Sequence, residues 1–224
     1  MFVALEGIDG AGKTSALRSA AEHLRARGYA VTAFPKQHPP VEDPYVRRHL
    51  DALRSLIWEH PDDDPYYRLG QYHWVHLVAS WFHAVHECVV RPMRERGELV
   101  LVDNWIHKGL ARLRLNESVD YDQVEGYFTA AGEPDLVILL DISPEVAASR
   151  KASFTAIEAG NLHAHIGINQ TNFIRYQQRL RRELHWFAAR DGWPVVPASE
   201  ATVEEIGSAV ADAVAERRST PTLA

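Results

Sequence analysis

The sequence predicts an α/β fold in which helices cover both faces of a mainly parallel sheet, giving three layers, α/β/α. Short apolar runs alternate with stretches of helical periodicity along the 224 residues, a rhythm typical of βαβ units. A glycine-rich loop follows the first apolar run directly and leads into a helical stretch. A chain of this length can bury one large core. We therefore expect a single domain over residues 1–218 and a disordered tail over residues 219–224.

Five apolar runs are the candidate strands of this sheet, and the stretches between them are the candidate helices. The runs are Phe2–Leu5, Ala30–Phe34, Leu99–Val102, Leu136–Leu140 and the shorter Val195–Val196. Helix ends carry stop and capping signals. These signals are Gly28 after a first helix over residues 14–27, Ser143-Pro144-Glu145 after the fourth run, and Thr202 with Glu205, a capping box, before a last helix. Residues 35–65 are rich in proline and aspartate, and we expect a loop with a short helix there.

The strongest functional signal is the segment Gly7–Thr14, GIDGAGKT, which matches the phosphate-loop pattern G-x-x-x-x-G-K-[ST] between a strand and a helix. In such a loop the backbone N–H groups point inward at phosphates, the lysine reaches the β/γ-phosphates and the hydroxyl binds Mg²⁺. The N-terminus of the following helix adds partial positive charge. The predicted nucleotide-phosphate cradle comprises Gly10, Ala11, Gly12, Lys13, Thr14 and Ser15.

Carboxylates at the ends of two candidate strands extend this prediction. Asp103 follows Leu99–Val102 and should lie at the carboxyl edge of the sheet, where open α/β folds bind their ligands. It is a candidate Mg²⁺ ligand or general base. For Asp141, which also ends a run, we favour a structural role because a helix-start signal follows at once. Asp9 lies inside the phosphate loop and could face either the loop backbone or an acceptor hydroxyl.

Composition excludes several other classes of protein. The formal net charge of −6 and a pI near 6.0 argue against nucleic acid or an anionic membrane as a partner. The single cysteine, Cys88, permits no internal disulfide and suits a reducing compartment; its apolar helical surroundings predict a small buried side chain. The first strand begins at residue 2, and no run approaches 18 apolar residues. We expect a cytoplasmic protein.

Taken together, these segments resemble the thymidylate kinase family from Phe2 to about Val214. The matching segments are Leu5–Thr14, Phe34-Pro35, His76-Leu77, Val90–Met93, Asp103, Gly109, Ala111 and Leu140–Glu145. The resemblance implies a P-loop kinase fold, ATP and Mg²⁺ as cofactors, a homodimer, and a lid over the donor phosphates, here about residues 151–170. It also implies that Asp9 contacts the acceptor sugar, that Asp103 serves the metal or the reacting hydroxyl, and that Arg150 contacts the donor phosphates. The predicted catalytic residues are Lys13, Asp103, Asp9 and Arg150.

The acceptor side departs from the family pattern. Where the family has an arginine that holds the acceptor 5′-phosphate, this chain has Asn104, followed by Trp105. Losing such a bidentate contact forfeits roughly 1.5–3 kcal/mol. His83 and Ala79 stand at the family's base-reading arginine and stacking phenylalanine, Lys36-Gln37-His38 replaces another phosphate-binding arginine, and the lid lacks the family's arginine cluster. The predicted acceptor site comprises Asp9, Phe34, Lys36, His76, Ala79, His83, Asn104, Trp105 and Lys108.

Lys108 and Arg47-Arg48 are the residues that could restore a cation to the acceptor site. The missing arginines nevertheless favour a phosphotransferase that moves the γ-phosphoryl group of Mg-ATP to a hydroxyl of a free or modified nucleoside. The alternative is a nucleoside monophosphate kinase in which Lys108 or Arg47 replaces the lost clamp. A non-catalytic nucleotide-binding switch is a third hypothesis, but an intact Gly12-Lys13-Thr14 together with Asp103 speaks against it.

Histidines form a further pattern on the helix that contains His76. Four of them fall within an arc of about 140° at 100° per residue; they are His73, His76, His83 and His86. Pairs three residues apart can hold a metal, but we favour places in the acceptor pocket or the core. His163 and His165 in the expected lid give a weaker metal signal.

Overall fold

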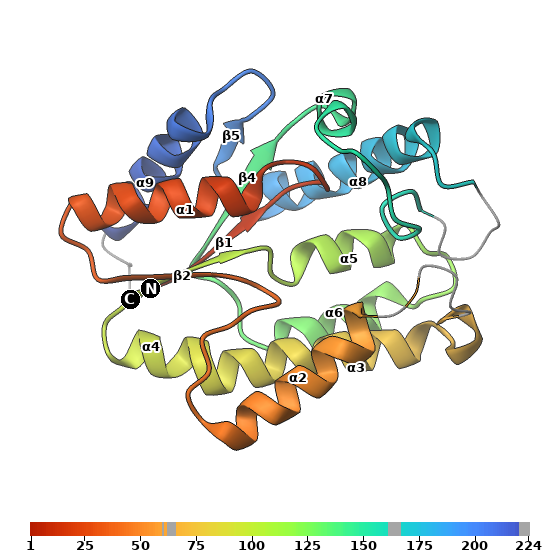
Figure 1. The fold of residues 1–224 in the computed structure, drawn as a ribbon, viewed down its shortest axis with the longest axis horizontal. Helices are drawn as coiled ribbons and strands as arrows, with labels where there is room; N and C mark the ends of the chain where they lie inside the picture. The colour runs from red at the N-terminus through yellow and green to blue at the C-terminus, as the bar shows by residue number, and fades with distance from the viewer. Residues whose placement is uncertain (60, 62–65, 161–166, 220–224) are drawn as a thin grey trace.

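The computed structural model describes residues 1–59, 61, 66–160 and 167–219. Its centre is a five-stranded sheet in the order β2-β3-β1-β4-β5, and every neighbouring pair is parallel (Figure 1). The strands are β1 Phe2–Glu6, β2 Val31–Pro35, β3 Leu99–Asp103, β4 Leu136–Asp141 and β5 Val195–Pro197. All five predicted strands are confirmed, with ends that differ by at most one residue.

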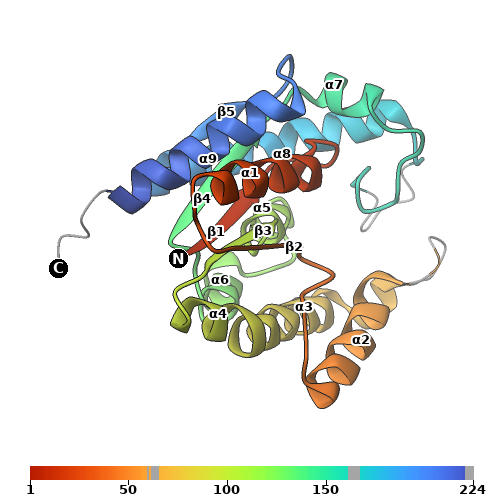
Figure 2. The ribbon, with the colours of Figure 1, turned by 60° about the vertical axis from the view of Figure 1, so that its left-hand side comes forward.

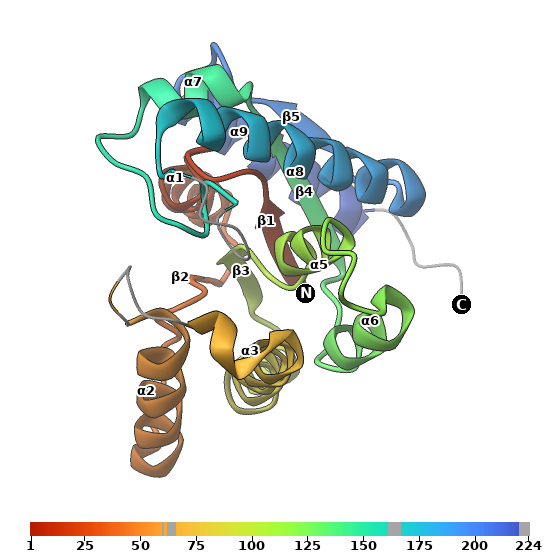
Figure 3. The ribbon, with the colours of Figure 1, turned by 90° about the vertical axis from the view of Figure 1, so that its right-hand side faces the viewer.

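Helices cover both faces of the sheet, which confirms the three-layer prediction. They are α1 Lys13–Ala26, α2 Pro44–Trp58, α3 Gln71–Val85, α4 Arg91–Glu95, α5 His107–Arg114, α6 Tyr121–Thr129, α7 Pro144–Ser149, α8 Gln170–Asp191 and α9 Val203–Ser219, with a 3₁₀ turn at Tyr66–Leu69 and a π-helical turn at His86–Val90. Helices α1 and α9 pack side by side on one face, whereas α3, α4 and α6 lie on the other (Figure 2). Helix α8 packs against α5 and α7 beside β4 (Figure 3).

Strand β1 lies in the middle of the sheet and positions the site. All five of its residues are buried, and it pairs with β3 on one side and β4 on the other. Strand β2 lies beyond β3, so the chain leaving β1 crosses over β3. The carboxyl ends of β1 and β3 therefore lie side by side at a switch in strand order, which is the ligand-binding edge of an open α/β sheet.

The helix-end signals lie where the sequence places them. Ser143 accepts a hydrogen bond from the backbone N–H of Val146 at 3.3 Å and begins α7. Thr202 and Glu205 exchange backbone-to-side-chain hydrogen bonds in both directions, at 2.8 and 3.2 Å. The first helix ends at Ala26, with Gly28 in the left-handed region at φ 85°. Local chemistry therefore sets these boundaries.

Three expectations about local structure need correction. Helix α2 is 15 residues long, more than the short helix expected over residues 35–65. Cys88 is exposed rather than buried and lies in the π-helical turn at His86–Val90, where Val89 and Val90 are the buried residues. Helix α9 includes Ser219, which was expected in a disordered tail, and residues 220–224 lie outside the described part of the chain. Among the described helices, none is both long and apolar enough to span a bilayer.

Candidate active site

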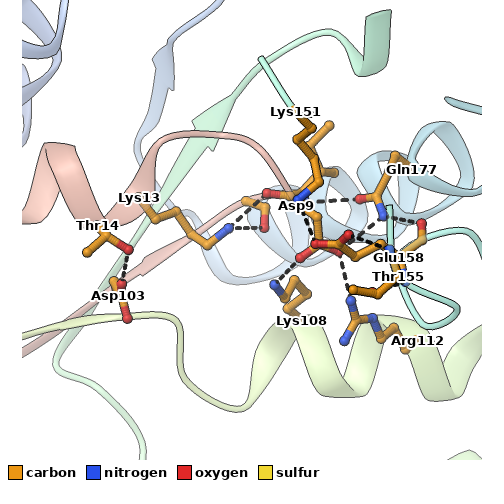
Figure 4. A network of polar contacts seen from close by, with 12 residues as sticks. Asp9, Lys13, Thr14, Asp103, Lys108, Arg112, Lys151, Thr155, Glu158 and Gln177 are labelled. Carbon is orange, nitrogen blue, oxygen red and sulfur yellow. Dashed lines mark hydrogen bonds and ion pairs between the residues drawn. The ribbon is translucent and has the colours of Figure 1, made fainter. Parts of the chain in front are cut away.

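The phosphate loop turns tightly between β1 and α1. Gly10 has φ 85°, and a Cβ there would lie 2.9 Å from the carbonyl oxygen of Ala147, so the loop needs glycine at this position. The Lys13 ammonium donates to the carbonyl oxygens of Gly7 at 3.0 Å and Ile8 at 2.8 Å (Figure 4). Burial and the nearby Lys108 lower the pKa of Lys13 to about 7. The ammonium is therefore held across the loop, where a bound phosphate would stabilise its charge.

Thr14 and Asp103 meet where α1 begins and β3 ends. The Thr14 hydroxyl donates to the Asp103 carboxylate (Figure 4). The other carboxylate oxygen accepts the backbone N–H of Lys36 at 2.9 Å. Asp103 is buried. A hydroxyl beside a carboxylate is the oxygen donor set that Mg²⁺ prefers in nucleotide sites. These two side chains thus fit the predicted metal-binding role.

Glu6 fixes the turn that follows β3. Its fully buried carboxylate accepts the backbone N–H groups of Trp105 at 2.9 Å and His107 at 3.2 Å. Between β3 and these amides, Asn104 has φ 97° and is buried. Burial raises the pKa of Glu6, but hydrogen bonding and charge from His107 outweigh it, so the pKa is lowered overall. Sequence reasoning gave Glu6 no role, although an acid at the end of an all-apolar strand was a usable signal.

Asp9 is the centre of a polar cluster beyond the phosphate loop. Its two carboxylate oxygens contact Lys108 and Arg112, each at 2.8 Å, and the Gln177 amide donates to it at 3.1 Å (Figure 4). Burial raises the pKa of Asp9, but Lys108, Arg112 and Lys13 together hold it well below its ordinary value. Asp9 is therefore a permanent carboxylate that organises cations, and it is a poor general base.

Lys36 brings a further cation to this place. Its ammonium lies 5.4 Å from the ring centroid of Trp58, and no carboxylate among the described residues forms an ion pair with it. Burial, followed by repulsion from Lys108 and Arg112, lowers the pKa of Lys36 to about 7. Within the described part of the chain, this partly buried lysine thus lies near two other cations and has no ion-pair partner of its own.

A pocket of about 170 Å³ opens next to these cations. Aromatic side chains from four parts of the chain line it, namely Trp58, Trp74, Phe82, Trp105 and Phe128. Lys36, Lys108 and Arg112 line both this pocket and an adjoining groove of about 510 Å³ that runs past Asp9 to Glu158. An aromatic chamber bordered by cations suits a flat base joined to an anionic group.

The structure brings some of the predicted acceptor residues together and leaves others apart. Asp9, Lys36, Trp105 and Lys108 line the pocket or the groove. Phe34, His76, Ala79, His83 and Asn104 are not among the lining residues. Phe34 and Ala79 are buried in the core, and Phe82 lines the pocket near the place expected for Ala79 and His83. The acceptor roles of these five residues stay predictions.

Side chains of the remaining predicted residues contact neighbouring backbone. His83 Nε2 lies 3.1 Å from the carbonyl oxygen of Tyr127, and His76 Nδ1 lies 2.6 Å from that of Tyr72. Arg150 donates to the carbonyl oxygens of Ala198 and Ser199 at 3.2 and 3.3 Å. Its predicted contact with donor phosphates therefore needs a change of conformation. Arg47 donates to the carbonyl of Val41, and both Arg47 and Arg48 are exposed on α2. Of the three candidate cations, Lys108 alone lines the pocket and the groove.

The structure does not support a metal site formed by the histidines of α3. In the described part of the chain, no group of three or more His, Cys, Asp and Glu side chains could hold a metal ion. His163 and His165 lie outside the described residues. Sequence reasoning missed Arg112, Gln177, Trp58 and Trp74. Arg112 had a usable signal, because it follows Lys108 by four residues and so shares its helical face.

The family model for thymidylate kinase matches residues 5–206 of this chain. The chain belongs to the thymidylate kinase family. It is 31% identical over 227 residues to a thymidylate kinase from Citrifermentans bemidjiense, covering 96% of this chain and 92% of the relative. A thymidylate kinase from Exiguobacterium is 29% identical, covering 81% and 85%, and one from Burkholderia vietnamiensis is 25% identical, covering 93% and 98%.

Family membership establishes the class of chemistry. The protein is a P-loop nucleotide kinase, a phosphotransferase whose phosphate donor is Mg-ATP. The predicted family, fold class and cofactors are therefore confirmed.

Proposed function

We propose that this kinase transfers the γ-phosphoryl group of Mg-ATP to the phosphate of a nucleoside monophosphate. The observation that carries the proposal is the partly buried ammonium of Lys36, which lines the pocket together with Lys108 and Arg112 and forms no ion pair with a carboxylate of the described residues. The curated relatives named above are thymidylate kinases. Both considerations favour a monophosphate over the free nucleoside that the sequence analysis favoured.

Electrostatics supports a phosphorylated acceptor. Lys108 and Arg112 share one ion-pair partner, Asp9, and Lys36 has none among the described residues. Burying an unpaired ammonium is costly, and its pKa falls as a result. A phosphate dianion at Lys36 would restore the charge balance and could accept charge-assisted hydrogen bonds. The missing clamp at Asn104 would then be replaced by cations that come from the end of β2 and from α5.

Residues of the donor half match the requirements of phosphoryl transfer. Lys13 would exchange the carbonyl oxygens of Gly7 and Ile8 for donor phosphate oxygens. Thr14 and Asp103 would hold Mg²⁺, which neutralises charge on the donor phosphates. Asp9 would hold Lys108 and Arg112 at the acceptor. Catalysis would then come from positioning and charge neutralisation, with no covalent intermediate.

An ADP-release assay tests the acceptor class. Thymidine and other nucleosides are compared with their own 5′-monophosphates, using wild type, Lys36→Met and Arg47→Gln as a matched control that removes an exposed cation. We expect monophosphates to be preferred. Lys36→Met should lower kcat/KM for them by about 10- to 100-fold, the value of one or two charge-assisted contacts, while KM for ATP stays within about twofold of wild type.

A second candidate acceptor, a free or modified nucleoside, retains one specific observation. Asn104 is neutral where the family has its phosphate clamp, and its buried Oδ1 atom has no hydrogen-bond partner. The same assay separates the two candidates. A higher kcat/KM for a free nucleoside than for its monophosphate, unchanged by Lys36→Met, would replace the proposal with this one.

Two implications of the family resemblance also stay predictions. Light scattering on purified protein checks the homodimer. The second is that residues 151–170 form a lid over the donor phosphates; of these, residues 161–166 lie outside the described part of the chain.

A further inference from the structure

Gln177 lies in the second turn of α8 and is fully buried. Its side-chain oxygen accepts the backbone N–H of Asp9 at 3.0 Å, and its side-chain nitrogen donates to the Asp9 carboxylate at 3.1 Å. The same nitrogen donates to the carbonyl oxygen of Glu158 at 2.8 Å (Figure 4). One amide thus contacts the phosphate loop twice and residues 155–160 once.

Only a primary amide can make this set of contacts. The Asp9 N–H needs an acceptor, whereas the Asp9 carboxylate and the Glu158 carbonyl both need donors, and a glutamine side chain supplies one acceptor atom and two N–H donors. A carboxylate at this position would have no donor and would face Asp9 with like charge. An apolar side chain would leave the buried Asp9 N–H unsatisfied.

Residues 155–160 are themselves held together by Glu158. Its carboxylate accepts from Lys151 at 2.9 Å and from the backbone N–H of Thr155 at 3.0 Å (Figure 4). Ile157 of this segment lines both the aromatic pocket and the groove. The position of the segment over the acceptor pocket is therefore connected through a single side chain to the orientation of Asp9.

We propose that Gln177 is a positioning residue for phosphoryl transfer, which fixes Asp9 and residues 155–160 relative to each other. Through Asp9 it sets the places of Lys108 and Arg112, which border the acceptor pocket. Gln177 itself touches neither the pocket nor the groove. The proposal rests on the phosphotransferase activity and holds for either class of acceptor.

Replacement of the amide tests this coupling. Gln177→Met keeps the approximate shape and removes all three hydrogen bonds, whereas Gln178→Met changes an exposed neighbour on the same helix. With the best acceptor from the assay above, we expect Gln177→Met to lower kcat by about 10- to 100-fold, as small misplacements of reacting groups do. KM for ATP should stay within about threefold, because the phosphate loop is otherwise intact. Gln178→Met should match wild type.

A pH profile separates positioning from a merely structural role. In Gln177→Glu, a protonated carboxyl can still accept from the Asp9 N–H and donate to the Asp9 carboxylate, whereas the ionised form cannot donate. The charged groups around it are Asp9, Lys108, Arg112, Lys151 and Glu158. Burial and Asp9 should raise the pKa of the new carboxyl above its ordinary value of about 4.3.

We therefore expect kcat of Gln177→Glu, divided by that of wild type, to rise severalfold as pH falls from about 8.5 to about 5.5, over the range where protonation returns the donor. The same ratio for Gln177→Met should stay flat. A flat ratio for Gln177→Glu overturns the proposal, as does a Gln177→Met enzyme with kcat within about twofold of wild type. The glutamate variant is compared with wild type at each pH, so its pH dependence can be measured even if Gln177→Met is unstable.

Discussion

The donor and acceptor halves of the site are built differently. The donor half comes from one continuous segment, Gly7–Thr14, with Asp103 added from the neighbouring strand. The proposed acceptor half, which is the aromatic pocket with its groove, collects single side chains from the end of β2, from α2, α3, α5 and α6, and from residues 155–158. The residues of the donor half are mostly neighbours in the sequence, whereas those of the acceptor half are brought together by tertiary packing.

This difference separates what is fixed in the fold from what can vary. The phosphate loop depends on backbone conformation, and a side chain at Gly10 would collide with Ala147. The positive charge at the pocket depends only on which side chains line it. Lys36, Lys108 and Arg112 could therefore replace a clamp at Asn104 without disturbing the sheet. Substitutions in the two halves should consequently have different signatures.

The largest effect is expected in the donor half. Lys13→Met removes the cation that would follow the transferred phosphoryl group, and turnover should fall by roughly a thousandfold. Because burial disfavours the Lys13 ammonium, its loss should leave the free energy of unfolding at or above that of wild type. The assay is ADP release, with urea unfolding as its control. Turnover within tenfold of wild type in a folded variant would remove the phosphate-loop mechanism.

Asp103→Asn keeps the shape of the side chain and removes its charge. We expect kcat to fall by about a hundredfold, while KM for ATP changes by less than about fivefold, because Lys13 and the loop amides still bind the phosphates. Steady-state kinetics at several Mg²⁺ concentrations measures both, and excess Mg²⁺ should recover part of the loss. An effect on acceptor KM alone would instead move Asp103 into the acceptor half.

The same contrast explains how far the sequence could be interpreted. The strands, the helix caps and the donor half depend on neighbours along the chain. Residues such as Gly28, Ser143 and Lys13 were therefore enough to predict them from the sequence. Lys108 could be predicted because it offers a cation close to Asn104, where the family resemblance leads one to expect an arginine. Trp58 and Gln177 had no such signal, because α2 and α8 meet the site only after the chain has folded. The expectation for Cys88 was wrong because an apolar helical stretch alone does not tell which of its positions face the core; here Val89 and Val90 do and Cys88 does not.

Proton uptake can sharpen the comparison, since each half contains one lysine with a pKa near 7. In the folded, ligand-free protein the pKa values of Lys13 and Lys36 are lowered to about 7, whereas in the unfolded chain they are about 10.4. The unfolded state binds more protons between these values, so this pair makes stability rise with pH from about 7 to about 10. Bound phosphates should raise both pKa values in the folded state.

Binding of Mg-ATP at pH 8 should therefore take up about one proton, through Lys13. Binding of the acceptor should take up a similar amount, through Lys36. Calorimetric titrations in two buffers of different ionisation enthalpy measure each uptake. Lys36→Met should abolish uptake on acceptor binding and preserve it on ATP binding. Heats that do not depend on the buffer in either titration would contradict the assignment of these two lysines.

The smallest expected effect concerns Asp141, the carboxylate at the end of β4. Arg181 contacts both of its oxygens, at 2.6 and 2.7 Å, and His185 lies at 2.9 Å. Hydrogen bonds from Arg181 are the main cause of its lowered pKa, against which burial acts. The Arg181 side chain is 38% exposed, so screening reduces what the pair contributes. We expect Asp141→Asn to lower the free energy of unfolding by about 1 kcal/mol at pH 7.

Asp141→Asn should leave kcat and both KM values unchanged, because none of these contacts reaches the phosphate loop or the acceptor pocket. Since the carboxylate has a lower pKa in the folded state than in the unfolded chain, its contribution is fully present above about pH 3.9 and is lost as pH falls through the lower folded-state value. The difference in unfolding free energy between Asp141→Asn and wild type should therefore shrink in acid. Urea unfolding at a series of pH values measures it. A drop in kcat comparable to that of Asp103→Asn would instead show that the fourth strand contributes to the chemistry, and the donor half would no longer be confined to the phosphate loop and β3.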